Sequence, residues 1–144
     1  ARLGFTNVVF HQQFEGPVGY FTLANDAIKL NDSEKLELGF GEHVELAAFP
    51  AVKIGRLAVH QDLHRKGVGA ALMTLLLGDI LNTAGLSAAR LIVVDADNDD
   101  AVLRFYEKLG FETSLWAEEM ARNHTKKRAK PQTIKMHRDV FKGL

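Results

Sequence analysis

Apolar and β-branched residues gather early in the chain into short runs that predict extended strands. Thr6–Gln12 and Val18–Ala24 are two such runs, and Glu15-Gly16-Pro17 between them has turn chemistry, so we expect a hairpin. Ala27–Leu30 could extend the second strand. The stretch Asn31–Glu45 is polar and acidic with two glycines, which predicts a loop.

The middle of the chain changes to helical spacing. Val52–Val59 is predicted to be a buried strand and His60–Lys66 a loop. A helix is expected from Gly67 to about Thr83, with Gly85 as its stop. Its apolar residues recur at intervals of three and four: Val68, Leu72, Leu75, Leu76 and Ile80.

The second half of the chain repeats the order of strand and helix. Ala89–Ala96 is almost wholly apolar, as in a strand covered on both faces. Asp97 or Asp99 can cap a helix over Asp100–Leu109, which Gly110 would end.

The last third of the chain is predicted to hold two strands with an insertion between them. Phe111–Leu115 and Thr133–Val140 are the strands, Trp116–Asn123 is compatible with a helix, and His124–Gln132 is a basic loop. The order β-β-β-α-β-α-β-β predicts one α/β (α+β) domain over residues 1–144 with a mixed sheet flanked by helices.

Composition excludes several classes of protein. Apolar residues make up 47% and charged residues 25%, which is typical of a globular protein. No apolar run reaches transmembrane length and no signal segment opens the chain, so we expect no membrane association and a cytoplasmic location. Cysteine is absent and no histidine pair has metal-ligand spacing, so no metal is expected. Most of the six histidines, His137 among them, are expected at the surface.

Charge is balanced over the whole chain but unevenly distributed. Residues 121–144 carry eight Lys and Arg against the single acid Asp139, whereas residues 91–120 carry eight acids against two basic residues. This asymmetry indicates either a polyanionic partner or a solvated basic surface. The residues that would contact a nucleic acid are Lys126, Lys127, Arg128 and Lys130.

The segment between the third strand and the first long helix has the chemistry of a phosphate site. A glycine-containing turn that opens a helix directs several backbone N–H groups and the positive end of the helix dipole at one point. The segment consists of Arg65, Lys66, Gly67, Val68, Gly69 and Ala70, in which the glycines allow close approach and the first two residues add positive charge. The dinucleotide fingerprint needs a third glycine where Leu72 stands, and the ATP-binding Gly-Lys-Ser/Thr is absent.

Three further features of the sequence accompany this loop. They are Leu57-Ala58-Val59 before it, Asn98 before the second helix, and the run Phe105–Phe111 (FYEKLGF). Together with the loop they resemble the GNAT superfamily of acyl-CoA N-acyltransferases over about residues 18–111. The resemblance implies a mostly antiparallel mixed sheet of GNAT type, whose usual first strand and helices are not visible, so N-terminal elements are expected to be missing.

The resemblance also implies a role for each matching residue. Leu57, Ala58 and Val59 would hydrogen-bond the pantetheine arm of acetyl-CoA, the loop would hold its pyrophosphate, and Asn98 would help to fix it. Tyr106 is the expected proton donor to the departing sulfur. His64 stands where the family usually has Gln or Arg, and it would contact phosphate or have no role. No general base stands out, and Glu45, His60 and Asp97 are the candidates.

The acceptor amine is left open between three hypotheses. The segments VGYFTLA and IGRLAV resemble the GNAT toxins of bacterial toxin–antitoxin pairs, which implies aminoacyl-tRNA as acceptor, an antitoxin protein as partner and a homodimer as a further assembly. An ordinary GNAT enzyme would instead acetylate a small amine, a peptide or a protein N-terminus. The third hypothesis is a non-catalytic module that binds acyl-CoA or RNA. An α-amine, with a pKa of about 7.7–8, is already partly neutral, so the lack of a clear base favours it over lysine.

Overall fold

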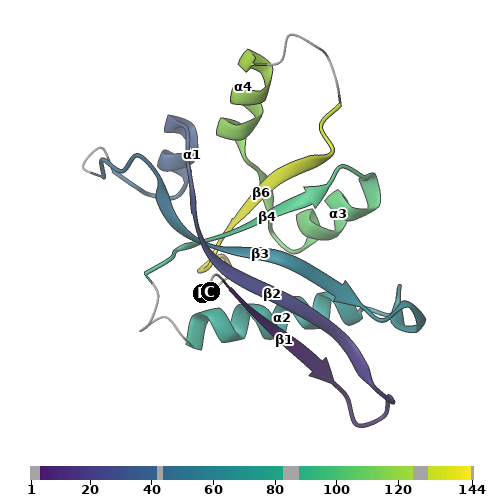
Figure 1. The fold of residues 1–144 in the computed structure, drawn as a ribbon. Coiled ribbons are helices and arrows are strands. Elements are labelled where there is room, and N and C mark those ends of the chain that lie inside the picture. Colours follow the sequence, from purple (N-terminus) through teal and green to yellow (C-terminus); the bar gives the residue numbers. More distant parts are fainter. Residues whose placement is uncertain (1–3, 42–43, 83–87, 125–129, 144) are drawn as a thin grey trace.

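The fold is built on a single sheet of six strands, in the order β1-β2-β3-β4-β6-β5 (Figure 1). The computed structural model describes residues 4–41, 44–82, 88–124 and 130–143. All neighbouring strands are antiparallel except β3 and β4, which are parallel, so the predicted mixed and mostly antiparallel sheet is confirmed. The strands are β1 (Phe5–Phe10), β2 (Pro17–Ile28), β3 (Phe49–Val59), β4 (Leu91–Asp97), β5 (Glu112–Thr113) and β6 (Thr133–Asp139).

The helices follow the predicted order with two additions, α1 (Asp32–Glu37) and the short 3-10 helix η1 (Gln61–Leu63), each in a segment predicted to be a loop. The others are α2 (Val68–Asn82), α3 (Asp100–Lys108) and α4 (Leu115–His124). Of the two predicted caps for α3, Asp99 is the one used, because its carboxylate accepts from the backbone N–H groups of Ala101 and Val102. The predicted helix stop Gly85 lies outside the described residues.

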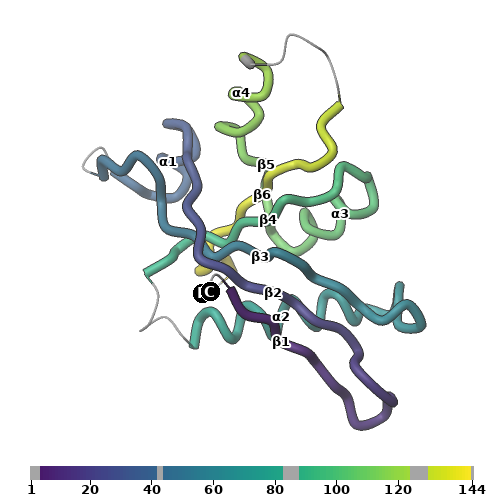
Figure 2. The backbone as a smooth tube through the Cα atoms, viewed as in Figure 1, coloured from purple at the N-terminus to yellow at the C-terminus, as the bar shows by residue number. Residues whose placement is uncertain are grey.

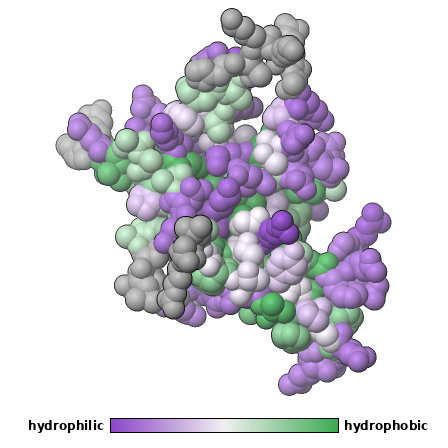
Figure 3. All heavy atoms as spheres, in the orientation of Figure 1, coloured by the Kyte–Doolittle hydropathy of each residue, from purple (hydrophilic) through white to green (hydrophobic). Residues whose placement is uncertain are grey.

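The larger core lies between the sheet and α2, which runs along the sheet beside β2 (Figures 1 and 2). Alternate strand residues face this helix, as the period of a strand requires. The members of this core include Phe21, Ile54, Met73, Leu76, Ile92 and Met136. A smaller core of alternate residues forms on the opposite face and comprises Ile28, Leu30, Phe49, Ala51, Leu91 and Val93. Hydrophilic side chains cover much of the outer surface seen in Figure 3.

The prediction of a loop throughout Asn31–Glu45 is wrong at its start, where α1 lies. Asn31 caps α1 by accepting from the backbone N–H of Glu34, and the Glu34 carboxylate accepts from the backbone N–H of Asn31. This reciprocal capping box satisfies donors that a one-and-a-half-turn helix cannot satisfy itself. The polar composition of the segment gives no apolar periodicity from which such a short helix could be predicted. The spacing Asn-x-x-Glu of a capping box is nevertheless a signal for its start.

Glu34 also links α1 to two distant parts of the chain. Its buried carboxylate accepts from the backbone N–H groups of Leu115 and Trp116 at 3.2 and 3.1 Å, and so caps α4. His137 Nε2 on β6 lies 2.8 Å from the same carboxylate. The expectation that His137 is at the surface is therefore wrong, since it is 5% exposed and paired with a buried acid.

The predicted strand Phe111–Leu115 is largely replaced by other structure. Only Glu112 and Thr113 pair with β6, while Phe111 enters the core and Leu115 begins α4. The capping bonds from Glu34 explain why the chain turns into a helix at that point. The other strands agree with prediction to within a few residues, and β2 runs on to Ile28, into the segment Ala27–Leu30 that was expected to extend it. Within the described residues, no helix is long and apolar enough to span a bilayer.

Replacing Glu34 with alanine should lower the free energy of unfolding by roughly 3–5 kcal/mol, because it leaves His137 and two helix N-termini without their buried partner. Urea denaturation measures this loss. Glu37→Ala, an exposed change on the same helix, is the matched control and should be nearly neutral. Equal stability of the two variants would contradict the role given to Glu34.

Candidate active site

The site begins where the two parallel strands separate. β3 pairs with β4 only from Ala51 to Ile54. On the other side of β3, the register with β2 slips by one residue, so that Gly55 has no partner in a β-bulge. A Cβ atom on Gly55 would lie 2.7 Å from Thr22 Oγ1, so the bulge at this position favours glycine. Beyond it β3 stays with β2 and leaves β4.

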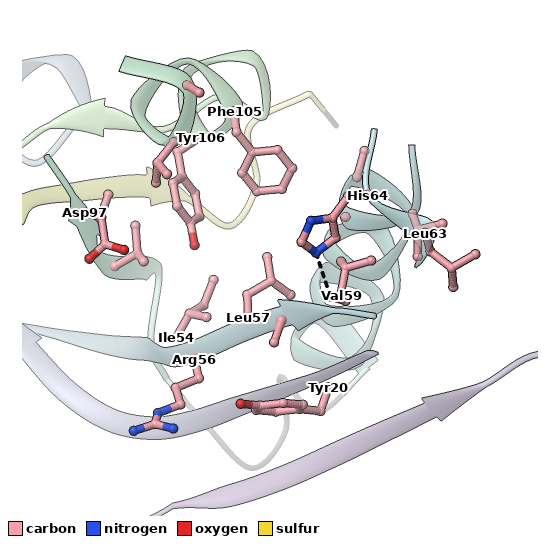
Figure 4. Close-up of a pocket in the computed structure, with 18 of the residues that line it drawn as sticks. Tyr20, Ile54, Arg56, Leu57, Val59, Leu63, His64, Asp97, Phe105 and Tyr106 are labelled. Carbon is pink, nitrogen blue, oxygen red and sulfur yellow. Dashed lines mark hydrogen bonds between the residues drawn. The ribbon is translucent and has the colours of Figure 1, made fainter. Parts of the chain in front are cut away.

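A cavity of about 820 Å³ lies around the gap between the separated strands. Figure 4 shows β3 forming its floor, with α3 across from it and the loop before α2 at one end. Nine of the residues predicted for acetyl-CoA or catalysis line it: Leu57, Ala58, Val59, Arg65, Gly67, Val68, Gly69, Ala70 and Tyr106. Residues far apart in the sequence are thus brought to one place.

The free edge of β3 presents backbone donors to this cavity. The N–H of His60 donates to the carbonyl of Val18 on β2 at 2.8 Å. Successive N–H groups of a strand point to opposite sides, so those of Val59 and Leu57 point away from β2 and into the gap. They can therefore pair with an extended ligand laid beside the strand.

The loop before α2 has the backbone conformation of an anion site. Arg65 and Gly67 both adopt positive φ, 62° and 76°, which turns the chain sharply into the helix. The first intrahelical bond runs from Ala71 to Gly67, so the N–H groups of residues 68–70 have no partner within the helix. At Gly69 a Cβ would lie 3.1 Å from Phe105 Cε2, so glycine here lets α2 approach α3 closely.

His64 ties this loop to the strand before it. Its Nε2 lies 2.8 Å from the carbonyl oxygen of Val59, the contact drawn in Figure 4. The side chain lines the cavity, and the contact fixes the distance between the end of β3 and the start of α2. A glutamine or arginine at this position could donate the same hydrogen bond, which explains how histidine is accommodated.

Tyr106 projects from α3 with its hydroxyl in the cavity (Figure 4). The ring is 7% exposed and packs edge-on against Phe105 and Phe111, with centroids 5.2 and 5.4 Å away. Burial, and after it the negative charge of Asp97, raise the pKa of Tyr106 above its usual value. The hydroxyl is therefore protonated at neutral pH and can donate a hydrogen bond or a proton.

Two predicted cofactor contacts, Lys66 and Asn98, are not among the cavity-lining residues. Asn98 has a different set of partners: its Nδ2 donates to the carbonyl of Pro131 at 2.8 Å, and its N–H to that of Gln132 at 2.9 Å. It thereby fastens the segment after the basic stretch to the end of β4. Lys130 is exposed next to this attachment, whereas Lys126, Lys127 and Arg128 lie outside the described residues.

Of the three candidate bases, the structure brings only Asp97 to the cavity wall. His60 instead caps η1 by accepting from the N–H of Asp62, and Glu45 lies on the exposed segment before β3. Sequence reasoning missed Tyr20 and Arg56, which also line the cavity. Both residues lie within the predicted strands, and no local pattern marks them as part of a site. Among the described residues, no group of His, Asp or Glu is arranged to hold a metal ion.

Comparison with solved structures supports the same architecture. AtaT complexed with acetyl-methionyl-tRNAfMet is 16% identical with a TM-score of 0.70, and the match covers 96% of this chain and 72% of that one. AtaTR bound with AcCoA is 17% identical with a TM-score of 0.66, covering 96% and 72%. The KacTA–DNA complex is 15% identical with a TM-score of 0.63, covering 97% and 70%. At these identities the likeness establishes the fold.

Sequence comparison gives the family. No curated protein sequence matches the chain. The family model of the acetyltransferase (GNAT) domain matches residues 9–113, a range that contains the loop, both separated strands and Tyr106. The chain therefore belongs to the GNAT family and is an acetyl-CoA-dependent N-acetyltransferase.

Proposed function

We propose that this enzyme transfers the acetyl group of acetyl-CoA to the α-amine of aminoacyl-tRNA, using the cavity between β3 and β4. The observation that carries the proposal is the meeting of three elements in that cavity: the free edge of β3, the N-terminus of α2 and the Tyr106 hydroxyl. Acyl transfer needs these elements together, because the thioester has to be bound, its carbonyl polarised and the departing thiolate stabilised.

Acetyl-CoA lies along β3 as an added strand. The inward N–H groups of Leu57 and Val59 bind its pantetheine arm, and the N-terminus of α2 holds its pyrophosphate. The N–H of Val59 faces the thioester oxygen, where one such donor contributes about 3–4 kcal/mol in other enzymes. Arg65 lines the phosphate end and adds positive charge.

Tyr106 acts on the departing sulfur. A free tyrosine has a pKa of about 10 and a thiol about 8.5, so a complete proton transfer from tyrosine to thiolate is uphill. The raised pKa of Tyr106 increases that difference. The hydroxyl therefore stabilises the developing thiolate mainly as a hydrogen-bond donor.

Two observations support an aminoacyl-tRNA acceptor. AtaT, which shares the fold, is known in complex with acetyl-methionyl-tRNAfMet. The attachment of Pro131 and Gln132 to Asn98 brings Lys130, at the end of the basic stretch, close to the end of β4, where Asp97 lines the cavity. A polyanion bound at Lys130 would therefore lie near the end of β4.

The partners follow from the same proposal. A tyrosine-to-phenylalanine mutant of the AtaT toxin is bound to the C-terminus of its antitoxin and acetyl-CoA. An antitoxin protein and a second copy of the chain are accordingly proposed as partners, and the cytoplasm as location, since acetyl-CoA and charged tRNA occur there. The alternative acceptors are a small amine, a peptide or a protein N-terminus.

Acetyl-CoA should raise the melting temperature of the protein, because it binds the native state alone. Gly69→Asp should abolish that shift, since it places a carboxylate among the phosphates and presses on Phe105. The matched control is Gly78→Asp, which introduces the same residue in the same helix at a position with open space around it. A shift that survives Gly69→Asp would remove the loop from the site.

Tyr106→Phe should lower kcat by about 10²-fold or more, as expected for a group that acts in the transition state. The KM for acetyl-CoA and its thermal shift should stay nearly unchanged, since the ring packing is retained. Steady-state kinetics at saturating acceptor measure both quantities. Full turnover in this variant would rule out the role at the sulfur.

Charged tRNA should be acetylated with a higher kcat/KM than free amino acids or peptides. Alanine at Lys126, Lys127, Arg128 and Lys130 should weaken this activity and reduce its dependence on salt. For each phosphate that the protein neutralises, log K for tRNA binding falls by roughly 0.7–0.9 per tenfold increase in salt concentration. Binding of acetyl-CoA should be unaffected. Equal or better activity on small amines would favour the alternative acceptors.

A further inference from the structure

The cavity has a second group of lining residues, on the sheet face away from α2. A Cβ on Gly19 would touch Leu72 of α2, so Gly19 faces that helix and its neighbour Tyr20 faces away. Tyr20 pairs with Ala58, and Thr22 with Arg56, so Arg56 shares the face of Tyr20. Figure 4 shows both side chains on the opposite side of β3 from Tyr106.

Asp97 belongs to the same face on the other side of the gap. Val94 and Ala96 of β4 lie in the core beneath α2, so Asp95 and Asp97, which alternate with them, point the other way. Asp95 is neutralised there by Lys53 and Lys135, at 2.8 and 3.1 Å. The carboxylate of Asp97 has no ion pair or hydrogen bond with any described residue.

Two unpaired charges of opposite sign therefore stand on opposite sides of one opening. The guanidinium of Arg56 is exposed and, like Asp97, makes no ion pair or hydrogen bond within the described part of the chain. Tyr20 beside it is half-buried and presents an aromatic ring. The phosphates of acetyl-CoA are bound at the N-terminus of α2, so Arg56 is not needed for them.

We propose that this opening is the acceptor subsite, in which Asp97 receives the amine and Arg56 with Tyr20 receives the 3′-terminal nucleotide that carries the aminoacyl group. The proposal rests on the proposed function. An aminoacyl-RNA end is itself polarised, with an amine at one end and a phosphate at the other, and the two sides of the opening match these charges. A guanidinium binds phosphate and an aromatic ring stacks on a base.

Asp97 would also take the proton that the amine loses. The neutral amine attacks the thioester carbon, the C–N bond forms, and Asp97 accepts one N–H proton. The C–S bond then breaks while Tyr106 gives its proton to sulfur, and the proton on Asp97 returns to Tyr106. One amine proton has moved to the coenzyme A thiol, and both side chains are restored. The proton that Asp97 returns replaces the one that Tyr106 gives to sulfur, so the side chain of Tyr106 does not remain as a tyrosinate.

The two sides of the opening predict different kinetic defects. Arg56→Ala should raise the KM for bulk charged tRNA by about tenfold or more, the loss of one charge-assisted hydrogen bond, and leave the KM for a mixture of amino acid methyl esters unchanged. Asp97→Asn should lower kcat by about 10²-fold on both acceptors with the KM for acetyl-CoA unchanged.

Arg104→Ala and Asp100→Asn serve as matched controls, because both residues are exposed on α3 and outside the cavity lining. All variants should keep the thermal shift with acetyl-CoA, which reports folding. If the wild type prefers methyl esters to charged tRNA, the proposal of aminoacyl-tRNA as acceptor is contradicted, whatever the results for the variants. Given a wild type that prefers charged tRNA, an unchanged KM in Arg56→Ala or an unchanged kcat in Asp97→Asn would overturn the subsite.

Discussion

The separation of β3 from β4 after Ile54 is the constraint on which the rest of the site depends. If the two parallel strands stayed paired, their backbone N–H and C=O groups would be hydrogen-bonded to each other and no cavity would form between them. The bulge at Gly55 bends β3 along β2, and the inward N–H groups of Leu57 and Val59 are then left for a ligand. The hydrogen bond between His64 and Val59 holds the start of α2 at the end of this edge.

The separation also connects the two faces of the sheet. The loop before α2 and Tyr106 lie on the face of α2 and α3, whereas strand alternation assigns Tyr20, Arg56 and Asp97 to the other face. In the proposed reaction, acetyl-CoA and the acceptor amine therefore enter the gap from opposite faces of the sheet. Tyr106 and Asp97 lie close enough for the negative charge of the carboxylate to add to the effect of burial in raising the pKa of the hydroxyl.

Features set by near neighbours in the chain were predictable from the sequence. Strand periodicity located β1 to β4 and β6, and the glycines at 67 and 69 located the turn that opens α2, because their effects act within a few residues. Features set by distant contacts were not. The start of α4 depends on the buried carboxylate of Glu34, and Asn98 depends on a carbonyl at residue 131, so local pattern could not assign these contacts. Asp97 was one of three candidate bases in the sequence, and only the gap between β3 and β4 singles it out and makes Arg56 a candidate.

Amide hydrogen exchange with and without acetyl-CoA tests the central claim most directly. Slower exchange is predicted at Leu57 and Val59 and at the first turn of α2, since these N–H groups gain a partner only when the cofactor lies in the gap. The N–H of His60, already bonded to Val18, should change little and serves as the internal reference. Protection confined to other strands, or none at Leu57 and Val59, would contradict an acetyl-CoA site built on the separated edge of β3.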